Sequence, residues 1–223
     1  MVQLILLRHG QTFANVEGRW VGRGETELTP LGWQQAGRTA QRLAREVQDL
    51  AALYSSPLKR ALDTATVIGR ALGCLPVVID DLREVDFGDM DGLTIAEMAE
   101  RDPGLYARWL DKADSEFTWP GGDRRADFFR RVSSAFDGLL ARHRSGTVIV
   151  VGHGGTIRAC LAHLFPVELG QWWTYKLENC ALTRVEVGED GARLVALNDA
   201  AHLAEIAASF SCLLYTSPSP RDS

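Results

Sequence analysis

The chain has 223 residues, of which 46% are hydrophobic and 24% charged, and its formal net charge is −5 at pH 7. A chain of this length can bury a substantial core and is most simply one domain. The mildly negative charge argues against general binding to nucleic acid or to anionic membranes. An anionic ligand would therefore need a local positive site.

The sequence carries no signal for export or membrane insertion. Its four cysteines show neither paired spacing nor a zinc-binding pattern, so we expect buried or free thiols in a reducing compartment. The apolar run at the N-terminus is short for a signal peptide and has no basic segment before it. No stretch is long enough to cross a membrane. These features predict a cytoplasmic protein.

The first apolar run, residues 2–7, predicts a buried strand that ends at Arg8, His9 and Gly10. Gly10 is expected to adopt backbone angles that other residues avoid, so that the chain turns sharply after the imidazole. Arg8 and His9 would then lie at the carboxyl end of a buried strand, where open α/β sheets bind their ligands. A surface Arg-His pair in a loop is the alternative interpretation of this triplet.

A second strand with the same ending is predicted at residues 147–151. It is followed by Gly152-His153-Gly154-Gly155-Thr156 and then by apolar residues at helical spacing. The free N–H groups at the start of such a helix favour an anion. Two strands that each end in a glycine-flanked histidine predict one site with convergent parts.

Two helix starts follow from a favoured N-cap residue with proline after it. Thr29 and Pro30 predict the first, and Ser56 and Pro57 predict a second whose first turn contains Arg60. A guanidinium there would add a fixed charge and a planar set of donors to the helix N-terminus. A solvated surface arginine is the alternative interpretation.

The remaining central segments are less regular. Residues 13–27 are polar and rich in glycine, which predicts a loop, and residues 101–125 are predicted to be irregular. Thr94 and Glu97 match a capping box at a helix start. Residues 80–91, after a short strand at 77–79, hold six carboxylates: Asp80, Asp81, Glu84, Asp86, Asp89 and Asp91. Charge-rich loops of this kind are usually only solvated.

The C-terminal part combines a long helix, a hairpin and an unusual tail. Residues 128–140 have the spacing of an amphipathic helix, and residues 182–187 and 194–197 alternate as a β-hairpin does. Residues 211–223 break this pattern and look like translated cloning sequence, non-native or disordered. We expect a single domain over residues 1–210.

These motifs together resemble the histidine phosphatase superfamily, the phosphoglycerate mutase-like enzymes. Arg8-His9-Gly10 and the glycine-flanked His153 carry the resemblance, and segments 28–36, 55–65 and 82–92 support it in the same order. The resemblance covers roughly residues 1–200. It implies an α/β fold of three layers, α/β/α, with a mostly parallel central sheet flanked by helices.

The resemblance also implies a role for each site residue. His9 would attack phosphorus, while Arg8, Arg60 and a protonated His153 would bind the phosphoryl oxygens, and Glu84 would be the proton donor. The loop after Glu84 leaves Asp86 as a competing acid, because a small shift of the loop could exchange the two.

Two further ligands of the phosphate are expected. Asn15 would donate its amide N–H, with the capping of a turn as the alternative, and Gly154 would contribute through the N-terminus of its helix. Many family members have Gly-Glu-Ser where this chain has Gly121, Gly122 and Asp123, which leaves that contact open.

The expected activity is hydrolysis of a small phosphomonoester, with no metal and no cofactor, because arginines would crowd a metal dication. A mutase-type phosphoryl transfer is the alternative, and a non-catalytic phosphate-binding protein is a more remote one. The sequence does not choose among sugar phosphates, phosphoglycerate-type acids and α-ribazole phosphate. We expect a small-molecule substrate and no nucleic acid or membrane partner, and we leave a homodimer open.

Overall fold

The computed structural model describes residues 1–166 and 171–206. The expectation for residues 211–223, and the predicted domain end at residue 210, lie outside the described residues. The described chain contains a six-stranded sheet in the order β3-β2-β4-β1-β5-β6. The strands are β1 (Val2–Arg8), β2 (Leu50–Ser55), β3 (Val77–Val78), β4 (Gly146–Gly152), β5 (Leu182–Gly188) and β6 (Gly191–Asp199).

The sheet is mostly parallel, as predicted. β3, β2, β4 and β1 run in one direction, and β5 pairs antiparallel with β1 on one side and with β6 on the other. In the parallel register of β1 and β4, Arg8 lies opposite Gly152. His9 and His153 therefore leave the sheet side by side at its carboxyl edge.

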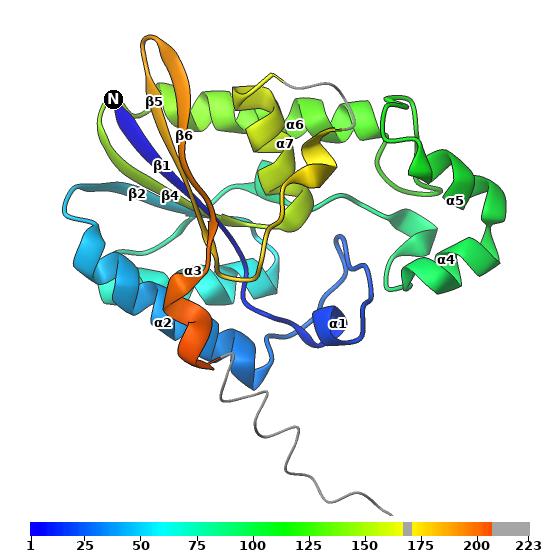
Figure 1. Ribbon diagram of the computed structural model, residues 1–223, viewed down its shortest axis with the longest axis horizontal. Helices are drawn as coiled ribbons and strands as arrows, with labels where there is room; N and C mark the ends of the chain where they lie inside the picture. Colours follow the sequence, from blue (N-terminus) through cyan, green and yellow to red (C-terminus); the bar gives the residue numbers. More distant parts are fainter. Residues whose placement is uncertain (167–170, 207–223) are drawn as a thin grey trace, which may run out of the picture.

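Helices cover both faces of this sheet and give the three predicted layers (Figure 1). α2 (Pro30–Glu46) and α3 (Lys59–Leu72) pack on one face, where Ile5 and Leu7 belong to the core. α6 (Arg125–Ala141) and α7 (Gly154–Leu164) pack on the other, against Leu4 and Leu6. Alternate residues of β1 thus enter opposite cores, and both are removed from water.

A third hydrophobic cluster lies beyond the carboxyl edge of the sheet, in a segment that we call the cap, residues 88–124. Its helices are α4 (Ile95–Arg101) and α5 (Pro103–Leu110). The cluster comprises Met90, Met98, Leu105, Trp109, Phe117 and Trp119. The remaining elements are the short helix α1 (Phe13–Val16) and the 3₁₀ turns η1 (Asp80–Leu82), η2 (Gly88–Met90), η3 (Gln171–Thr174) and η4 (Ala201–Leu203).

Two loop predictions need correction. The segment 101–125 is not irregular throughout, because Asp102 accepts a hydrogen bond from the backbone N–H of Leu105 at 2.8 Å and Pro103 follows it, which starts α5. The predicted loop 13–27 begins with the helical turn α1, which is too short to show a hydrophobic period.

The helix starts were predicted with mixed success. Thr29 caps α2 with a hydrogen bond from Gly32 N, and Thr94 and Glu97 form both bonds of the capping box. Ser56 does not cap α3, which begins at Lys59 after Leu58 with no side-chain cap. Arg60 nevertheless lies in the first turn of α3, as expected.

Gly10 is required for a different reason from the one predicted. Its φ is not positive, so it does not make a left-handed turn. Instead, a Cβ at Gly10 would lie 2.5 Å from the carbonyl oxygen of Gly32 in α2, and a Cβ at Gly32 would overlap the carbonyl oxygen of Gln11. The two glycines allow the end of β1 to pass directly against the first turn of α2.

The described helices are all too short or too polar to cross a bilayer.

We predict opposite effects for alanine at two glycines of α2. Gly32→Ala should lower the free energy of unfolding by about 1–3 kcal/mol, since its Cβ meets backbone atoms that cannot rotate away. Gly37→Ala should raise it by about 0.5–1 kcal/mol, because its Cβ would meet nothing within 4 Å and glycine disfavours helix. Urea unfolding of both variants measures this, and equal effects would contradict the close approach.

Candidate active site

The two histidines lie together beneath the carboxyl edge of the sheet. His9 is 4% exposed and His153 is 1% exposed, and their ring centroids are 5.3 Å apart. His9 Nδ1 is 2.8 Å from the carbonyl oxygen of Gly10. A carbonyl can only accept, so Nδ1 carries the proton and Nε2 keeps the lone pair. The ring of His9 is therefore in the tautomer that a nucleophile at Nε2 needs.

Whereas His9 is held through Nδ1, His153 is held through Nε2. Its Nε2 is 2.7 Å from Ser56 Oγ, the hydroxyl that was predicted to cap α3. Its Nδ1 is buried and has no hydrogen-bond partner among the described residues. His153 also precedes α7, so the ring and the first N–H groups of that helix face the same region.

Burial and neighbouring cations hold both imidazoles neutral. Burial lowers the pKa of His9 well below its usual value, and Arg8 and Arg60 lower it further. Burial also lowers the pKa of His153, with added repulsion from Arg60. The neutral His9 agrees with the prediction. The protonated His153 does not, and it would need an anion beside it to offset these cations.

Arg60 and Arg8 supply the positive charge. Arg60 is 1% exposed and donates to the carbonyl oxygens of Gly24 at 2.9 Å and Gly22 at 2.6 Å. Arg8 donates to the carbonyl oxygen of Leu177 at 3.2 Å, while its buried Nε has no partner among the described residues. Burial lowers the pKa of Arg8 to about 10, and Glu84 opposes this effect. Both guanidiniums are poorly solvated and favour an anion.

Glu84 lies at the site and Asp86 does not, which separates the two acid candidates by position. Glu84 is 8% exposed, and its Oε2 accepts from Gly155 N at 2.8 Å while Oε1 accepts from Val85 N at 3.0 Å. Asp86 instead accepts from Gly88 N and pairs with Arg23 at 3.3 Å.

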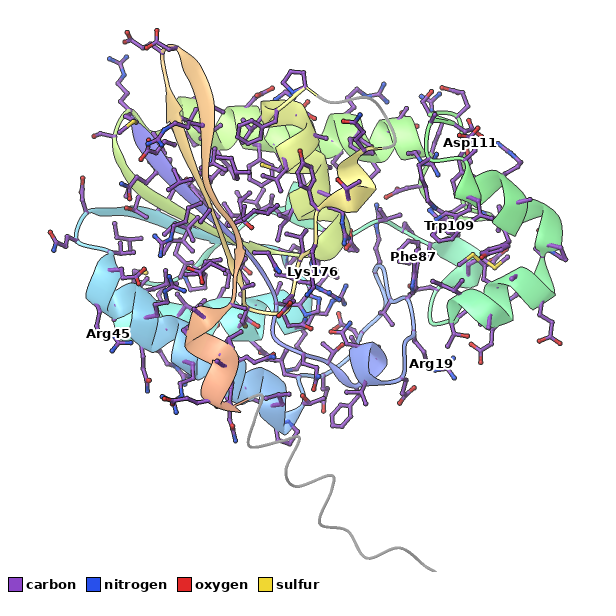
Figure 2. The ribbon with its side chains drawn as sticks, in the orientation of Figure 1. Arg19, Arg45, Phe87, Trp109, Asp111 and Lys176 are labelled. Atoms are coloured by element: carbon purple, nitrogen blue, oxygen red, sulfur yellow. The ribbon has the colours of Figure 1, made fainter. Side chains whose placement is uncertain are left out.

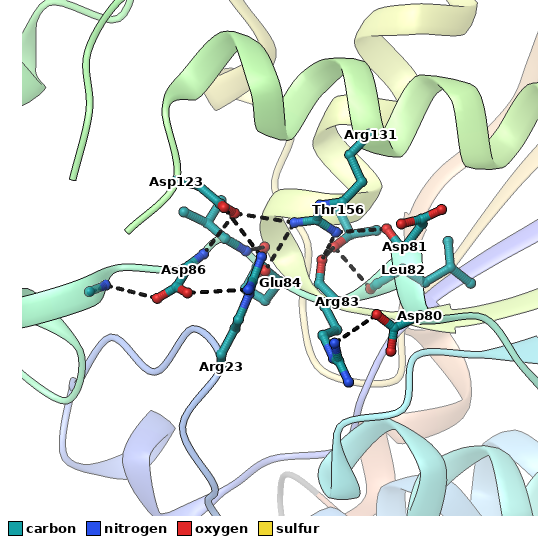
Figure 3. A network of polar contacts seen from close by, with 12 residues as sticks. Arg23, Asp80, Asp81, Leu82, Arg83, Glu84, Asp86, Asp123, Arg131 and Thr156 are labelled. Atoms are coloured by element: carbon teal, nitrogen blue, oxygen red, sulfur yellow. Dashed lines mark hydrogen bonds and ion pairs between the residues drawn. The ribbon is translucent and has the colours of Figure 1, made fainter. Parts of the chain in front are cut away.

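The loop that carries Glu84 is fixed from behind by α6 and α7 (Figure 3). Arg131 donates to the carbonyl oxygens of Asp81 and Arg83 at 2.8 and 3.0 Å, and it pairs with Asp123 at 3.3 Å. The hydroxyl of Thr156 also donates to the carbonyl oxygen of Arg83. These bonds hold the carboxyl group in place without using its oxygens.

Asp123, the last residue of the Gly121-Gly122-Asp123 segment, interacts with the acidic loop. Its Oδ2 accepts from Asp86 N at 3.0 Å and faces Arg131, and its Oδ1 pairs with Arg23 at 3.2 Å. Asp123 thus stabilises the acidic loop.

Asn15 shows the capping interaction that was kept as the alternative. Its Oδ1 accepts from Thr12 N at 3.2 Å, which completes a capping box around α1, and also from Asn179 Nδ2 at 3.2 Å. The amide Nδ2 of Asn15 makes no hydrogen bond to the described residues, and Asn15 lines the site cavity. Capping and donation to a phosphate are therefore compatible.

Several site residues were missed by the sequence reasoning. Arg158 lines the cavity one helical turn after Gly154, and its spacing on α7 could have indicated it. A Cβ at Gly155 would overlap Glu84 Oε1, so an added methyl group there would displace the carboxyl group. Asn179 donates to the carbonyl oxygen of His9 at 2.8 Å from a distant loop, and no local pattern marks it.

A cavity of about 300 Å³ lies at this site. Its phosphate end, as we call it, comprises Arg8, His9, Asn15, Arg60, Glu84, Gly154, Gly155 and Arg158. Its opposite end is aromatic and reaches the cap. Within residues 1–166 and 171–206, His, Cys, Asp and Glu side chains form no group of three or more that could hold a metal ion.

Comparison with known proteins identifies the family of this chain. A family model of the histidine phosphatase superfamily (branch 1) matches residues 4–200. The bifunctional protein Rv2228c of Mycobacterium tuberculosis is 43% identical over 195 residues, which cover 87% of this chain and 53% of that protein. The chain thus spans about half the length of this relative. Phosphoserine phosphatase 1 of Hydrogenobacter thermophilus is 33% identical, with 92% and 96% covered.

Solved structures show the same fold. YhfR of Bacillus stearothermophilus superimposes with a TM-score of 0.82 at 31% identity, covering 91% of this chain and 100% of that one. The α-ribazole phosphatase of Shigella flexneri gives 0.79 at 26% identity, with 88% and 96% covered. The resemblance inferred from the sequence is therefore confirmed, and the chain belongs to the histidine phosphatase superfamily, branch 1.

Proposed function

We propose that this domain hydrolyses a small phosphomonoester through a phosphohistidine on His9, without a metal ion. The observation that carries the proposal is the buried, neutral His9, whose Nδ1 is engaged by Gly10 while Nε2 keeps its lone pair. Arg8 and Arg60 lie beside it and repel a proton from the ring but attract a phosphate. This combination suits in-line attack on phosphorus.

In the first step Nε2 of His9 forms a bond to phosphorus as the bond from phosphorus to the ester oxygen breaks. Arg8, Arg60 and the first N–H groups of α7 stabilise the charge on the equatorial oxygens. The dianion also favours a proton on His153, which then donates to it. Glu84 gives its proton to the leaving oxygen, so the alcohol departs neutral.

In the second step the same carboxylate works in reverse. Ionised Glu84 takes a proton from water, and the water oxygen attacks phosphorus as the bond to Nε2 breaks. Inorganic phosphate leaves, and His9 returns to its neutral form. Hydrogen bonds from Gly155 N and Val85 N keep the carboxyl group of Glu84 in position between the two steps.

The phosphatases among the relatives of this chain favour hydrolysis over transfer to a second substrate. They include phosphoserine phosphatase 1 and, at 36% identity, a glucosyl-3-phosphoglycerate phosphatase of Mycolicibacterium vanbaalenii. The mutase alternative has its own test: with 3-phosphoglycerate and a bisphosphate primer, the protein should release phosphate and should not accumulate 2-phosphoglycerate.

We predict a covalent phosphoryl group on His9. Protein quenched with an alkaline denaturant after incubation with a labelled phosphomonoester should carry label that is stable in base and is lost on later treatment with acid. Labelling and turnover should survive dialysis against a strong chelator, because arginines and backbone amides stabilise the charge. Wild-type turnover by His9→Ala would remove His9 from the reaction, and activity that is lost to the chelator and restored by zinc, manganese or magnesium would overturn metal independence.

The lowered pKa of His9 predicts a dependence of stability on pH. Unfolded histidine titrates near pH 6.5, and the folded value lies below it, so the unfolded state binds the proton first as the pH falls. The contribution of the neutral histidine to the free energy of unfolding is fully present above pH 6.5. Below pH 6.5 this contribution declines by up to about 1.4 kcal/mol per pH unit for each histidine with a lowered pKa. Urea unfolding from pH 7.5 to 5.5 should give a smaller acid slope for His9→Gln than for wild type. Equal slopes would contradict the lowered pKa.

Glu84 should matter most when the leaving group is poor. Glu84→Gln keeps one oxygen for a backbone N–H but cannot give up a proton. With an alkyl phosphate, turnover should fall on the order of 10²–10⁴-fold. With p-nitrophenyl phosphate, phosphorylation should suffer much less, and a burst of nitrophenol should precede slow turnover because dephosphorylation lacks its base.

A neighbouring variant separates the position of Glu84 from its chemistry. Gly155→Ala keeps the carboxyl group but would displace it, since the new Cβ overlaps Oε1. It should show the same dependence on leaving group with a smaller loss, while Asp86→Asn should keep the wild-type pattern. Equal losses of Glu84→Gln on both substrates, without a burst, would make Asp86 the next acid to test.

A further inference from the structure

The cavity end opposite the phosphate end is formed by aromatic side chains. Trp20, Phe87 and Phe129 are partly buried there, and Trp109 and Trp119 lie behind them at 7% and 6% exposure. We call Trp20, Phe87, Trp109, Trp119 and Phe129 the aromatic end. Partly buried rings that line a cavity leave ring surface available to a ligand.

Ring-to-ring contacts make most of the aromatic end a fixed wall. The ring of Trp20 is 5.0 Å from Trp109 and 5.4 Å from Phe87, and Phe87 is 5.0 Å from Trp119. Trp109 and Trp119 belong to the core of the cap, and Figure 2 shows Phe87 and Trp109 on the inner side of α4 and α5. A wall held by its own core is preorganised for stacking.

The cations near this end already have partners. Arg125 donates to the carbonyl oxygens of Asp111 and Asp114 at 2.7 and 2.5 Å. Arg19 pairs with Glu17 and Glu97 at 2.9 and 2.8 Å. The acid that lines this part, Asp123, is likewise paired, with Arg23 and Arg131. A short phosphorylated acid would therefore find little compensation for its carboxylate here.

We propose that the aromatic end binds a flat, uncharged ring on the alcohol part of the substrate. The preferred class is then a phosphate ester whose alcohol carries an aromatic or heterocyclic ring, in preference to carboxylate-bearing phosphates. The inference rests on the proposed function in one respect, that the phosphate reacts at His9. Glu84 protonates the leaving oxygen, and the loop continues from Glu84 through Val85 to Phe87, so the alcohol extends from the acid toward the rings.

The catalytic test compares two probes that differ only in the ring. Adenosine 5′-monophosphate and ribose 5-phosphate share the sugar and the primary alcohol. Stacking of one base on aromatic side chains corresponds to roughly 5- to 150-fold in affinity. We therefore expect kcat/KM to be at least about 10-fold higher for the nucleotide, mainly through KM. Equal values, or a higher value for phosphoserine or 3-phosphoglycerate, would overturn the ring preference.

A matched pair of variants locates the effect. Trp20→Leu, with Phe87→Leu as a second variant, should reduce the ratio between the two probes toward one. Phe13→Leu removes a ring of helix α1 that is 51% exposed and does not line the cavity, and the ratio for this variant should stay at the wild-type value. A wild-type ratio in folded Trp20→Leu and Phe87→Leu would place the ring elsewhere.

A binding measurement separates this inference from the proposed reaction. His9→Ala cannot form the phosphohistidine, so calorimetry of that variant measures affinity without turnover. Tighter binding of the nucleotide than of ribose 5-phosphate supports the aromatic end, even if wild type hydrolyses neither. Turnover of both by wild type, with equal affinities in His9→Ala, overturns the aromatic end and leaves the phosphohistidine reaction standing.

Discussion

The site depends on the parallel pairing of β1 with β4, in which Arg8 lies opposite Gly152. Both strands are buried on both faces, so a slip by one residue would turn each apolar side chain into the wrong core. The register that the cores enforce is the register that brings His9 and His153 together. Hydrophobic burial far from the site therefore sets the distance between its two imidazoles.

A second constraint is the concentration of positive charge in a poorly solvated place. Arg8, Arg60 and Arg158 all have lowered pKa values because of burial, and Glu84 is the acid that opposes this in each case. Carbonyl oxygens of the loop at residues 21–24 solvate Arg60 in place of water. The positive side chains are therefore held in place before an anion binds. Such preorganisation lowers an activation barrier, because the site does not need to rearrange during the reaction.

The sequence predicted those parts whose cause is local. Buried strands, the caps at Thr29 and Thr94, and the two glycine-flanked histidines are visible because the responsible residues are neighbours. Roles that depend on position in the fold were harder to predict from the sequence. Ser56 looked like a helix cap, but its hydroxyl interacts with His153. Glu84 and Asp86 are distinguished only by the packing of α7 on the acidic loop. Asn179 is 170 residues from His9 along the chain, so its bond could not be anticipated.

The separate hydrophobic cluster of the cap has an evolutionary consequence. The rings that would contact the alcohol part of a substrate pack with Met98, Leu105 and Phe117. The histidines instead follow strands that pack in the two cores of the sheet. Substitutions that repack the cap can alter the shape offered to a substrate while leaving the strand register untouched. A domain of this kind can diversify by exchanging one small module, because selection on recognition and selection on chemistry act on different packed units.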